Sequence, residues 1–225
     1  MKSLYFFLLF GCIHSVSAQL KTISDKTTYP FWINVPEKES TEKQPILIFL
    51  HGKSLSGTDL NRVRRYGVLR AMDKGRKIPA IVVAPQLAKG SWNPDKVLEV
   101  LEYVQKNYNT DSTRVYVCGM SLGGYGTLHF AGKHADKITA AVAICGGGNV
   151  SDGCKLATIP LWIQHGDKDY IVPMSESEKV VNAIRKCNEK AKLIFTVIKG
   201  GNHGSVENIF HQDAMYNWLF EQKRE

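Results

Sequence analysis

The sequence has few of the features that mark membrane, metal-binding or multidomain proteins. Its one strongly apolar run, residues 4–10, is too short to cross a bilayer. No internal repeat, low-complexity tract or Pro/Gly-rich linker divides the 225 residues. Neither a zinc-ligand spacing nor a phosphate-binding glycine loop occurs. These absences predict one globular domain with no cofactor, no metal ion, no nucleic-acid partner and no stable membrane insertion.

The first eighteen residues have the pattern of a secretory signal peptide. Lys2 precedes the apolar run, and the small residues Val16 and Ala18 suit a signal peptidase that cleaves after Ala18. We therefore expect residues 1–18 to be a signal peptide, residues 19–225 to be a single domain, and the protein to be secreted or periplasmic. A lipoprotein anchor at Cys12 is the less favoured alternative, because the bulky Phe10 stands where such signals carry a small residue.

Cysteine is scarce, and four cysteines follow the expected cleavage site. Cys118 and Cys145 lie in apolar, strand-like runs and are expected to be small buried hydrophobic residues. Cys154 and Cys187 flank polar segments, so they are the favoured disulfide pair among three possible connectivities.

Acidic residues are outnumbered, 21 against 29 Lys and Arg, which gives a net charge of +8. The most basic stretch is residues 61–77, where Asp73 is the only acid. A solvated helix face is the favoured interpretation, and attraction of an acidic polysaccharide is the alternative.

Short apolar runs alternate with amphipathic stretches. Buried strands are expected at residues 46–50, 81–84, 114–118, 139–145, 161–164 and 193–198, and helices at residues 59–72, 95–108, 122–134, 175–186 and 209–220. Residues 29–35 are expected to add an antiparallel edge strand. This order predicts an α/β protein with a mostly parallel sheet, helices on both faces, and active groups at the carboxyl ends of the strands.

One of these junctions carries a nucleophile motif. The strand at 114–118 runs into Gly119-Met120-Ser121-Leu122-Gly123, which opens the helix at 122–134. A G-x-S-x-G turn between a strand and a helix is a nucleophile elbow, in which the flanking glycines allow the sharp turn that exposes the serine. The alternative is a glycine-rich helix entry with an idle serine.

The serine needs a histidine base and a carboxylate. His203 lies in a glycine-rich loop directly after the last strand. Of the other six histidines, His14 is lost with the expected signal peptide, and the remaining five are better explained structurally or by a solvent-facing position. Two acids, Asp167 and Asp169, compete in the loop that follows the strand at 161–164.

These segments resemble the α/β-hydrolase superfamily. The stretch from His165 to Pro173 is similar to the family's H-G-x-x-D-x-x-V-P segment, which implies that Asp169 is the triad acid and Asp167 a turn residue. Phe49-Leu50-His51-Gly52-Lys53 resembles the F-L-H-G-x segment, which implies an oxyanion hole made by the backbone amides of Lys53 and Leu122. The order Ser121, Asp169, His203 is that of the superfamily.

The resemblance is closest to the small, uncapped phospholipase/carboxylesterase-like or dienelactone-hydrolase-like branch, which includes secreted bacterial esterases of plant-polysaccharide esters. Residues 146–160 leave no room for a lid domain. We therefore expect a secreted serine carboxylesterase that uses an acyl-enzyme and no cofactor. Its expected substrates are short-chain or aromatic acyl esters, either small molecules or polysaccharide esters. The alternatives are a lysophospholipase or lipase, or a prolyl-oligopeptidase-like serine peptidase.

Trp92 is the candidate substrate-binding residue. It lies in the loop after the strand at 81–84, on the expected active-site edge of the sheet, where it is predicted to stack on a sugar or phenolic ring. The alternative is an aromatic side chain packed against the next helix.

Overall fold

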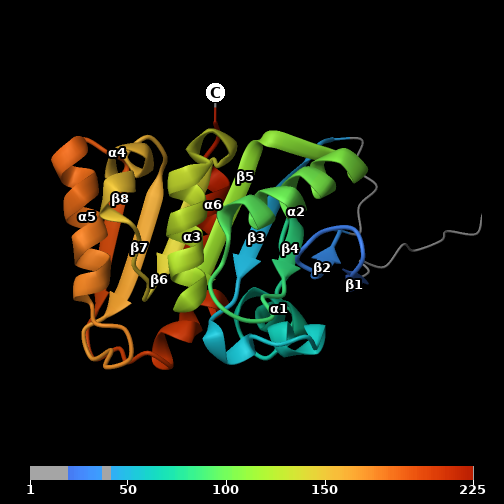
Figure 1. The fold of residues 1–225 in the computed structure, drawn as a ribbon, viewed down its shortest axis with the longest axis horizontal. Helices are drawn as coiled ribbons and strands as arrows, with labels where there is room; N and C mark the ends of the chain where they lie inside the picture. The colour runs from blue at the N-terminus through green and yellow to red at the C-terminus, as the bar shows by residue number, and fades with distance from the viewer. Residues whose placement is uncertain (1–19, 37–41, 225) are drawn as a thin grey trace, which may run out of the picture.

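The computed structural model describes residues 20–36 and 42–224. The expected signal peptide lies outside these residues. The strands form one eight-stranded sheet in the order β1-β2-β4-β3-β5-β6-β7-β8 (Figure 1). Their bounds are Leu20–Ile23 (β1), Phe31–Asn34 (β2), Gln44–Leu50 (β3), Ile81–Pro85 (β4), Thr110–Met120 (β5), Ala140–Ile144 (β6), Leu161–Gly166 (β7) and Leu193–Ile198 (β8). Strands β3 to β8 are parallel, and β2 runs antiparallel to both of its neighbours, β1 and β4, which confirms the predicted α/β fold.

Helices cover both faces of the sheet (Figure 1). The α-helices are Gly67–Asp73 (α1), Pro94–Asn107 (α2), Leu122–Lys133 (α3), Gly153–Leu156 (α4), Ser175–Cys187 (α5) and Asp213–Glu221 (α6). Short 3-10 helices span Lys53–Leu55 (η1), Leu60–Arg64 (η2), Ala135–Lys137 (η3), Val150–Asp152 (η4) and Ser205–His211 (η5). Side chains of α2, α3 and α5 pack on one face, and those of α1, η5 and α6 pack on the other.

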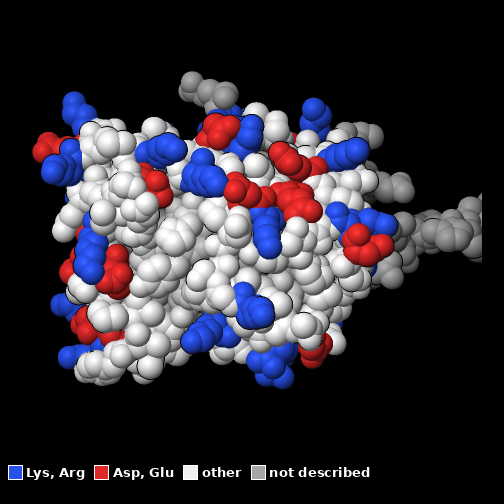
Figure 2. Space-filling view, in the orientation of Figure 1, with Lys and Arg blue, Asp and Glu red and all other residues white. Residues whose placement is uncertain are grey.

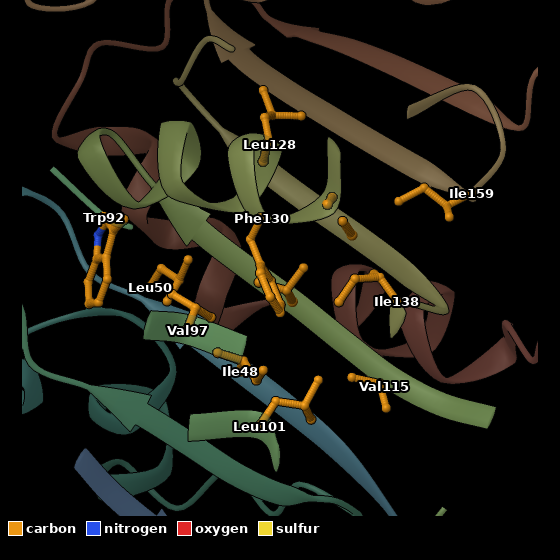
Figure 3. Close-up of a cluster of buried hydrophobic side chains, with 14 of the residues drawn as sticks. Ile48, Leu50, Trp92, Val97, Leu101, Val115, Leu128, Phe130, Ile138 and Ile159 are labelled. Carbon is orange, nitrogen blue, oxygen red and sulfur yellow. The ribbon is translucent and has the colours of Figure 1, made fainter. Parts of the chain in front are cut away.

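Alternate residues of the central strands point to opposite cores. Ile48 of β3 packs with Leu101 of α2 and Phe130 of α3 (Figure 3), whereas its neighbour Phe49 packs edge-on against Phe210 of η5. Parallel strands that are buried on both faces need apolar residues at every position. This two-sided burial explains the continuous apolar runs in the sequence.

Three local expectations differ from the structure. The helix expected at 59–72 is split into η2 and α1, because Tyr66 is extended and Gly67 has a positive φ of 78°. The helix expected at 209–220 begins as η5 and is broken at Gln212, which is extended, before α6 starts. Strand β2 is not at the edge of the sheet, because the short strand β1 pairs with its outer side.

The segment between β6 and β7 contains only η4 and α4, so none of the described residues there forms a lid. A disulfide joins Cys154 of α4 to Cys187 at the end of α5, with the two Cα atoms 5.1 Å apart, which confirms the favoured pairing. Cys118 and Cys145 are buried free thiols, as expected. No helix among the described residues is long and apolar enough to span a membrane.

Two arginines of the basic stretch at 61–77 form intramolecular ion pairs. Arg64 forms an ion pair of 2.6 Å with Asp73, and Arg76 forms one of 2.8 Å with Asp213. Arg76 also lies over the Tyr216 ring, 4.6 Å from its centroid. On the face covered by α2, α3 and α5, acidic and basic residues are interspersed (Figure 2). The ion pairs and the ring contact favour a structural role for Arg64 and Arg76.

Candidate active site

Ser121 lies on a strained turn between β5 and α3. Its φ of 59° and ψ of −123° fall outside the regions that non-glycine residues usually adopt. A Cβ atom at Gly123 would overlap the carbonyl oxygen of Leu50, and one at Gly119 would overlap the Gly123 carbonyl. The two glycines therefore allow β3, β5 and α3 to approach closely, and the turn that results is the predicted nucleophile elbow.

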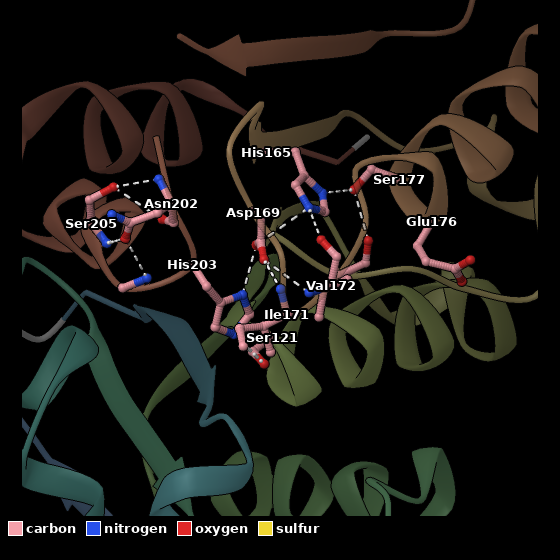
Figure 4. Close-up of polar contacts among 12 residues, drawn as sticks. Ser121, His165, Asp169, Ile171, Val172, Glu176, Ser177, Asn202, His203 and Ser205 are labelled. Carbon is pink, nitrogen blue, oxygen red and sulfur yellow. Dashed lines mark hydrogen bonds and ion pairs between the residues drawn. The ribbon is translucent and has the colours of Figure 1, made fainter. Parts of the chain in front are cut away.

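The structure brings Ser121, His203 and Asp169 together in a hydrogen-bonded chain (Figure 4). His203 Nε2 lies 2.9 Å from Ser121 Oγ, and His203 Nδ1 lies 2.7 Å from Asp169 Oδ2. The three residues come from loops at the carboxyl ends of β5, β8 and β7. With Nδ1–H donated to the carboxylate, Nε2 accepts the serine hydroxyl proton. This is the geometry of a general base beside a nucleophile.

Asp169 is buried and held as a carboxylate. Burial alone would raise its pKa, but hydrogen bonds from the Val172 amide, the His203 ring and the Ile171 amide outweigh burial and lower the pKa below its ordinary value. The competing acid, Asp167, has another partner, because its Oδ1 accepts from the Gly200 amide at 2.7 Å. In the loop after β7, Asp169 is therefore the partner of His203, whereas Asp167 links this loop to the loop after β8.

The buried ring of His165 fixes the loop that carries Asp169. Its Nε2–H donates to the Val172 carbonyl at 2.9 Å, and its Nδ1 is hydrogen-bonded to Ser177 Oγ at 2.7 Å. His165 is thus a structural residue, as predicted.

Each of the two predicted oxyanion donors is the first residue of a helix. Lys53 is the first residue of η1, and Leu122 is the first residue of α3. The amide of a first helical residue has no acceptor within its own helix, so both N–H groups are available to an external oxygen. The neighbouring Gly52 amide is already engaged, because it donates to the Tyr66 hydroxyl at 2.8 Å.

The Ser121 hydroxyl opens into a cleft of about 570 Å³. The cleft is lined by Lys53, Ser54, Tyr66, Met120, Ser121, Ile171, His203, Gly204 and Glu207. Tyr66, Ile171 and Glu207 line the cleft although no sequence motif marks them. Ile171 stands two residues after the predicted acid and is 73% exposed, which is unusual for isoleucine.

The substrate-binding role predicted for Trp92 is wrong. Its side chain is only 4% exposed, and its indole N–H donates to the His51 carbonyl at 3.0 Å. The ring lies edge-on to Tyr29 and His51, and it fills the space left by the missing side chain of Gly126. The loop leaves the sheet at the active-site edge, but the tryptophan turns back into the core (Figure 3).

Cys145 lies beside the same groups and is not a competing nucleophile. Its sulfur is within 4.8 Å of ligand atoms of Asp169 and His203. Burial raises the pKa of this thiol to about 12, so it stays protonated at neutral pH. Ser121 is therefore the better placed nucleophile.

Comparison with known proteins agrees with this geometry. The profile of the dienelactone hydrolase family matches residues 82–208. A bifunctional acetylxylan esterase/xylanase of Neocallimastix patriciarum is 34% identical over 91 residues, which are 40% of this chain and 13% of that protein. The chain thus covers only a small part of the curated relative it matches.

Solved structures share the fold across nearly the whole chain. A thermostable esterase superposes with a TM-score of 0.80 at 29% identity, covering 91% of this chain and 63% of its own. A feruloyl esterase module from Clostridium thermocellum superposes with a TM-score of 0.68 at 16% identity, covering 95% and 91%. The family match spans more than half of the sequence and includes the elbow, the carboxylate and the histidine. The chain therefore belongs to the dienelactone hydrolase family.

Proposed function

We propose that this protein is a serine carboxylesterase. The observation that carries the proposal is the hydrogen-bonded chain from Ser121 Oγ through His203 to Asp169, with distances of 2.9 and 2.7 Å, at the floor of an accessible cleft. The family match and the 29% identical esterase support ester hydrolysis as the reaction.

The proposed reaction has two halves. His203 Nε2 takes the proton of Ser121 as its Oγ attacks the ester carbonyl, and the Lys53 and Leu122 amides stabilise the negative oxygen that forms. His203 then gives this proton to the alcohol as the ester C–O bond breaks, and the acyl group stays on Ser121. In the second half His203 takes a proton from water as the water attacks the acyl-enzyme, and it returns this proton to Ser121 Oγ as the acid is released. Asp169 orients the ring and stabilises its cation throughout.

Short-chain or aromatic acyl esters of plant-polysaccharide origin are the proposed substrates. The acetylxylan esterase relative supports this class by sequence. An accessible cleft with a partly apolar lining of Tyr66, Met120 and Ile171 supports it physically, because such a cleft admits a small acyl group on a bulky carrier.

We also propose that the protein is exported. The N-terminal pattern of residues 1–18 supports export, and so does the Cys154–Cys187 disulfide, because such bonds persist in oxidising compartments.

A panel of esters tests the function directly. Acetyl, butyryl, long-chain acyl, feruloyl and methyl-uronate esters and a proline peptide should be compared, with Ser121→Ala as the inactive variant. Ser112→Ala, an exposed serine at the far end of the same strand, is the matched control. We expect hydrolysis of acetyl or feruloyl esters and a loss of about 10⁴-fold or more in Ser121→Ala. Cleavage of the peptide alone would contradict the esterase proposal.

A further inference from the structure

Glu207 is the only acidic side chain that lines the cleft, among the residues that the structure describes. It lies on η5, four residues after His203, and its side chain is 26% exposed. Neither the motifs nor the proposed mechanism assigns it a role. A carboxylate beside a reacting ester needs an explanation, because it affects which substrates the cleft accepts.

The local structure holds this carboxylate in a fixed orientation. Its Oε1 accepts from the Gly67 amide at 3.0 Å and from His211 Nε2 at 3.1 Å. The Gly67 donor is a backbone group at the start of α1, where φ is 78°, and Phe49 leaves no room for a side chain at this position. With Oε1 engaged twice, Oε2 has no hydrogen-bond partner among residues 20–36 and 42–224.

Glu207 and His203 line the same cleft. His203 Nε2 must reach the oxygen of the leaving alcohol in order to protonate it. The alcohol therefore enters the cleft that the Glu207 carboxylate lines.

We propose that Glu207 forms a carbohydrate subsite, in which Oε2 accepts hydrogen bonds from free hydroxyl groups next to the esterified position of a neutral sugar. This inference rests on the proposed esterase function. An ionised carboxylate accepts strong hydrogen bonds from hydroxyl donors and repels other anions. Glu207 therefore favours neutral sugars such as pentoses over uronic acids as the alcohol, and it opposes the attraction of Lys53, which lines the same cleft, for anions.

The test uses three substrates that share one acetyl group. Acetylated methyl xyloside carries free hydroxyls, acetylated methyl glucuronoside adds a carboxylate, and 4-nitrophenyl acetate is the reference without hydroxyls. In Glu207→Gln, which keeps an acceptor for the Gly67 amide, the ratio of kcat/KM for the xyloside to that for the aryl ester should fall. The expected fall is about tenfold to a hundredfold, as for the loss of a hydrogen bond to a charged group. The glucuronoside-to-xyloside ratio should rise by at least about tenfold in the same variant.

The matched control is Glu189→Gln, which removes the same charge from an exposed site after α5 and should leave both ratios unchanged. A second measurement needs no variant: methylating the free hydroxyls of the xyloside should lower its kcat/KM with the wild-type enzyme. Unchanged ratios in an active Glu207→Gln enzyme, or equal rates on the methylated sugar, would overturn the subsite alone. Absence of hydrolysis of all three esters by the wild-type protein would overturn the esterase function itself.

Discussion

Asp167 and Asp169 are two residues apart in one loop, yet they have different partners. Asp169 accepts from His203 and from the amides of Ile171 and Val172, whereas Asp167 accepts from Gly200. We expect Asp169→Asn to lower kcat on an acetyl ester by about 10⁴-fold, because an amide stabilises neither the required histidine tautomer nor its cation. Asp167→Asn should cost less than about tenfold, because it does not contact His203. Equal losses in steady-state assays of the two variants would contradict this assignment.

The buried ring of His51 makes the stability of the fold depend on pH. Burial lowers the pKa of His51 to about 4, outweighing the favourable hydrogen bond to the Gly52 carbonyl. An unfolded histidine binds a proton near pH 6.5, so between these two pH values the unfolded chain holds more protons than the folded one and stability rises with pH. Acidification from pH 7 to pH 4 should therefore remove up to about 3 kcal/mol of unfolding free energy through this group.

Urea unfolding at several pH values measures this effect. His51→Gln should be less stable at neutral pH, because Leu87 loses the ring nitrogen to which its amide donates. Its stability should depend less steeply on pH over the same window. A pH dependence as steep as that of the wild-type protein would show that another group titrates.

Single residues differ in how well the sequence predicts them. Ser121 and His203 were predictable, because each stands in a glycine-rich turn after a strand and the chemistry admits few residue types there. The buried position of Trp92 was not predictable. The sequence locates its loop but not the direction of its side chain, which packs into the space left by the missing side chain of Gly126. Glu207 enters the cleft through contacts with Gly67, 140 positions away in the chain, and no local pattern reports such a contact.

The Cys154–Cys187 disulfide links helices α4 and α5 and closes a loop of 33 residues. Cross-linking a loop of this length stabilises a fold by about 3–4 kcal/mol in the chain-entropy account. We expect the double variant Cys154→Ser/Cys187→Ser to lose about 2–4 kcal/mol of unfolding free energy while it keeps its activity on an aryl acetate. Neither helix contributes a residue to the cleft.

Denaturant unfolding with and without a reducing agent provides the control for this prediction. Reduction should lower the stability of the wild-type protein to that of the double variant and leave the variant unchanged. A loss of activity in the folded double variant would show that the disulfide itself is needed to hold α5, and with it Ser177 and His165, in place beside the Asp169 loop.

Helix and strand boundaries show where local patterns stop being informative. The parallel strands were predictable because two-sided burial makes each one a continuous apolar run. The break in the helix expected at 59–72 was not predictable. It falls at Tyr66 and Gly67, whose partners are distant in the chain: the Gly52 amide donates to the Tyr66 hydroxyl, and the Phe49 ring packs against Gly67. Strand β1 has two exposed residues out of four and lacks an apolar signal.

At the scale of the whole molecule, the cleft is open because only η4 and α4 lie between β6 and β7 in the described structure. Each methylene buried in an apolar tunnel contributes about 0.8 kcal/mol, so an enzyme with such a tunnel gains kcat/KM as the acyl chain grows. We expect kcat/KM here to peak at acetyl or butyryl esters and to fall for longer chains.

Rates on a series of straight-chain aryl esters, measured below and above the micellar concentration of the longest one, check this prediction. No rise in rate is expected at the interface, because no lid has to open. Preferred hydrolysis of long chains, or a sharp rise above that concentration, would indicate a lipase or lysophospholipase with an apolar acyl site near Ile171.

Ser121 should carry the acyl group during turnover. Intact-protein mass spectrometry after rapid mixing with an activated acetyl ester, followed by peptide mapping, measures this directly; Ser121→Ala and the matched Ser112→Ala serve as controls. We expect one acetyl group on the peptide that contains Ser121 in the wild-type and Ser112→Ala proteins, and none in Ser121→Ala. A stoichiometric acetyl group on another residue, or undiminished ester hydrolysis by Ser121→Ala, would contradict the role of Ser121 as the nucleophile.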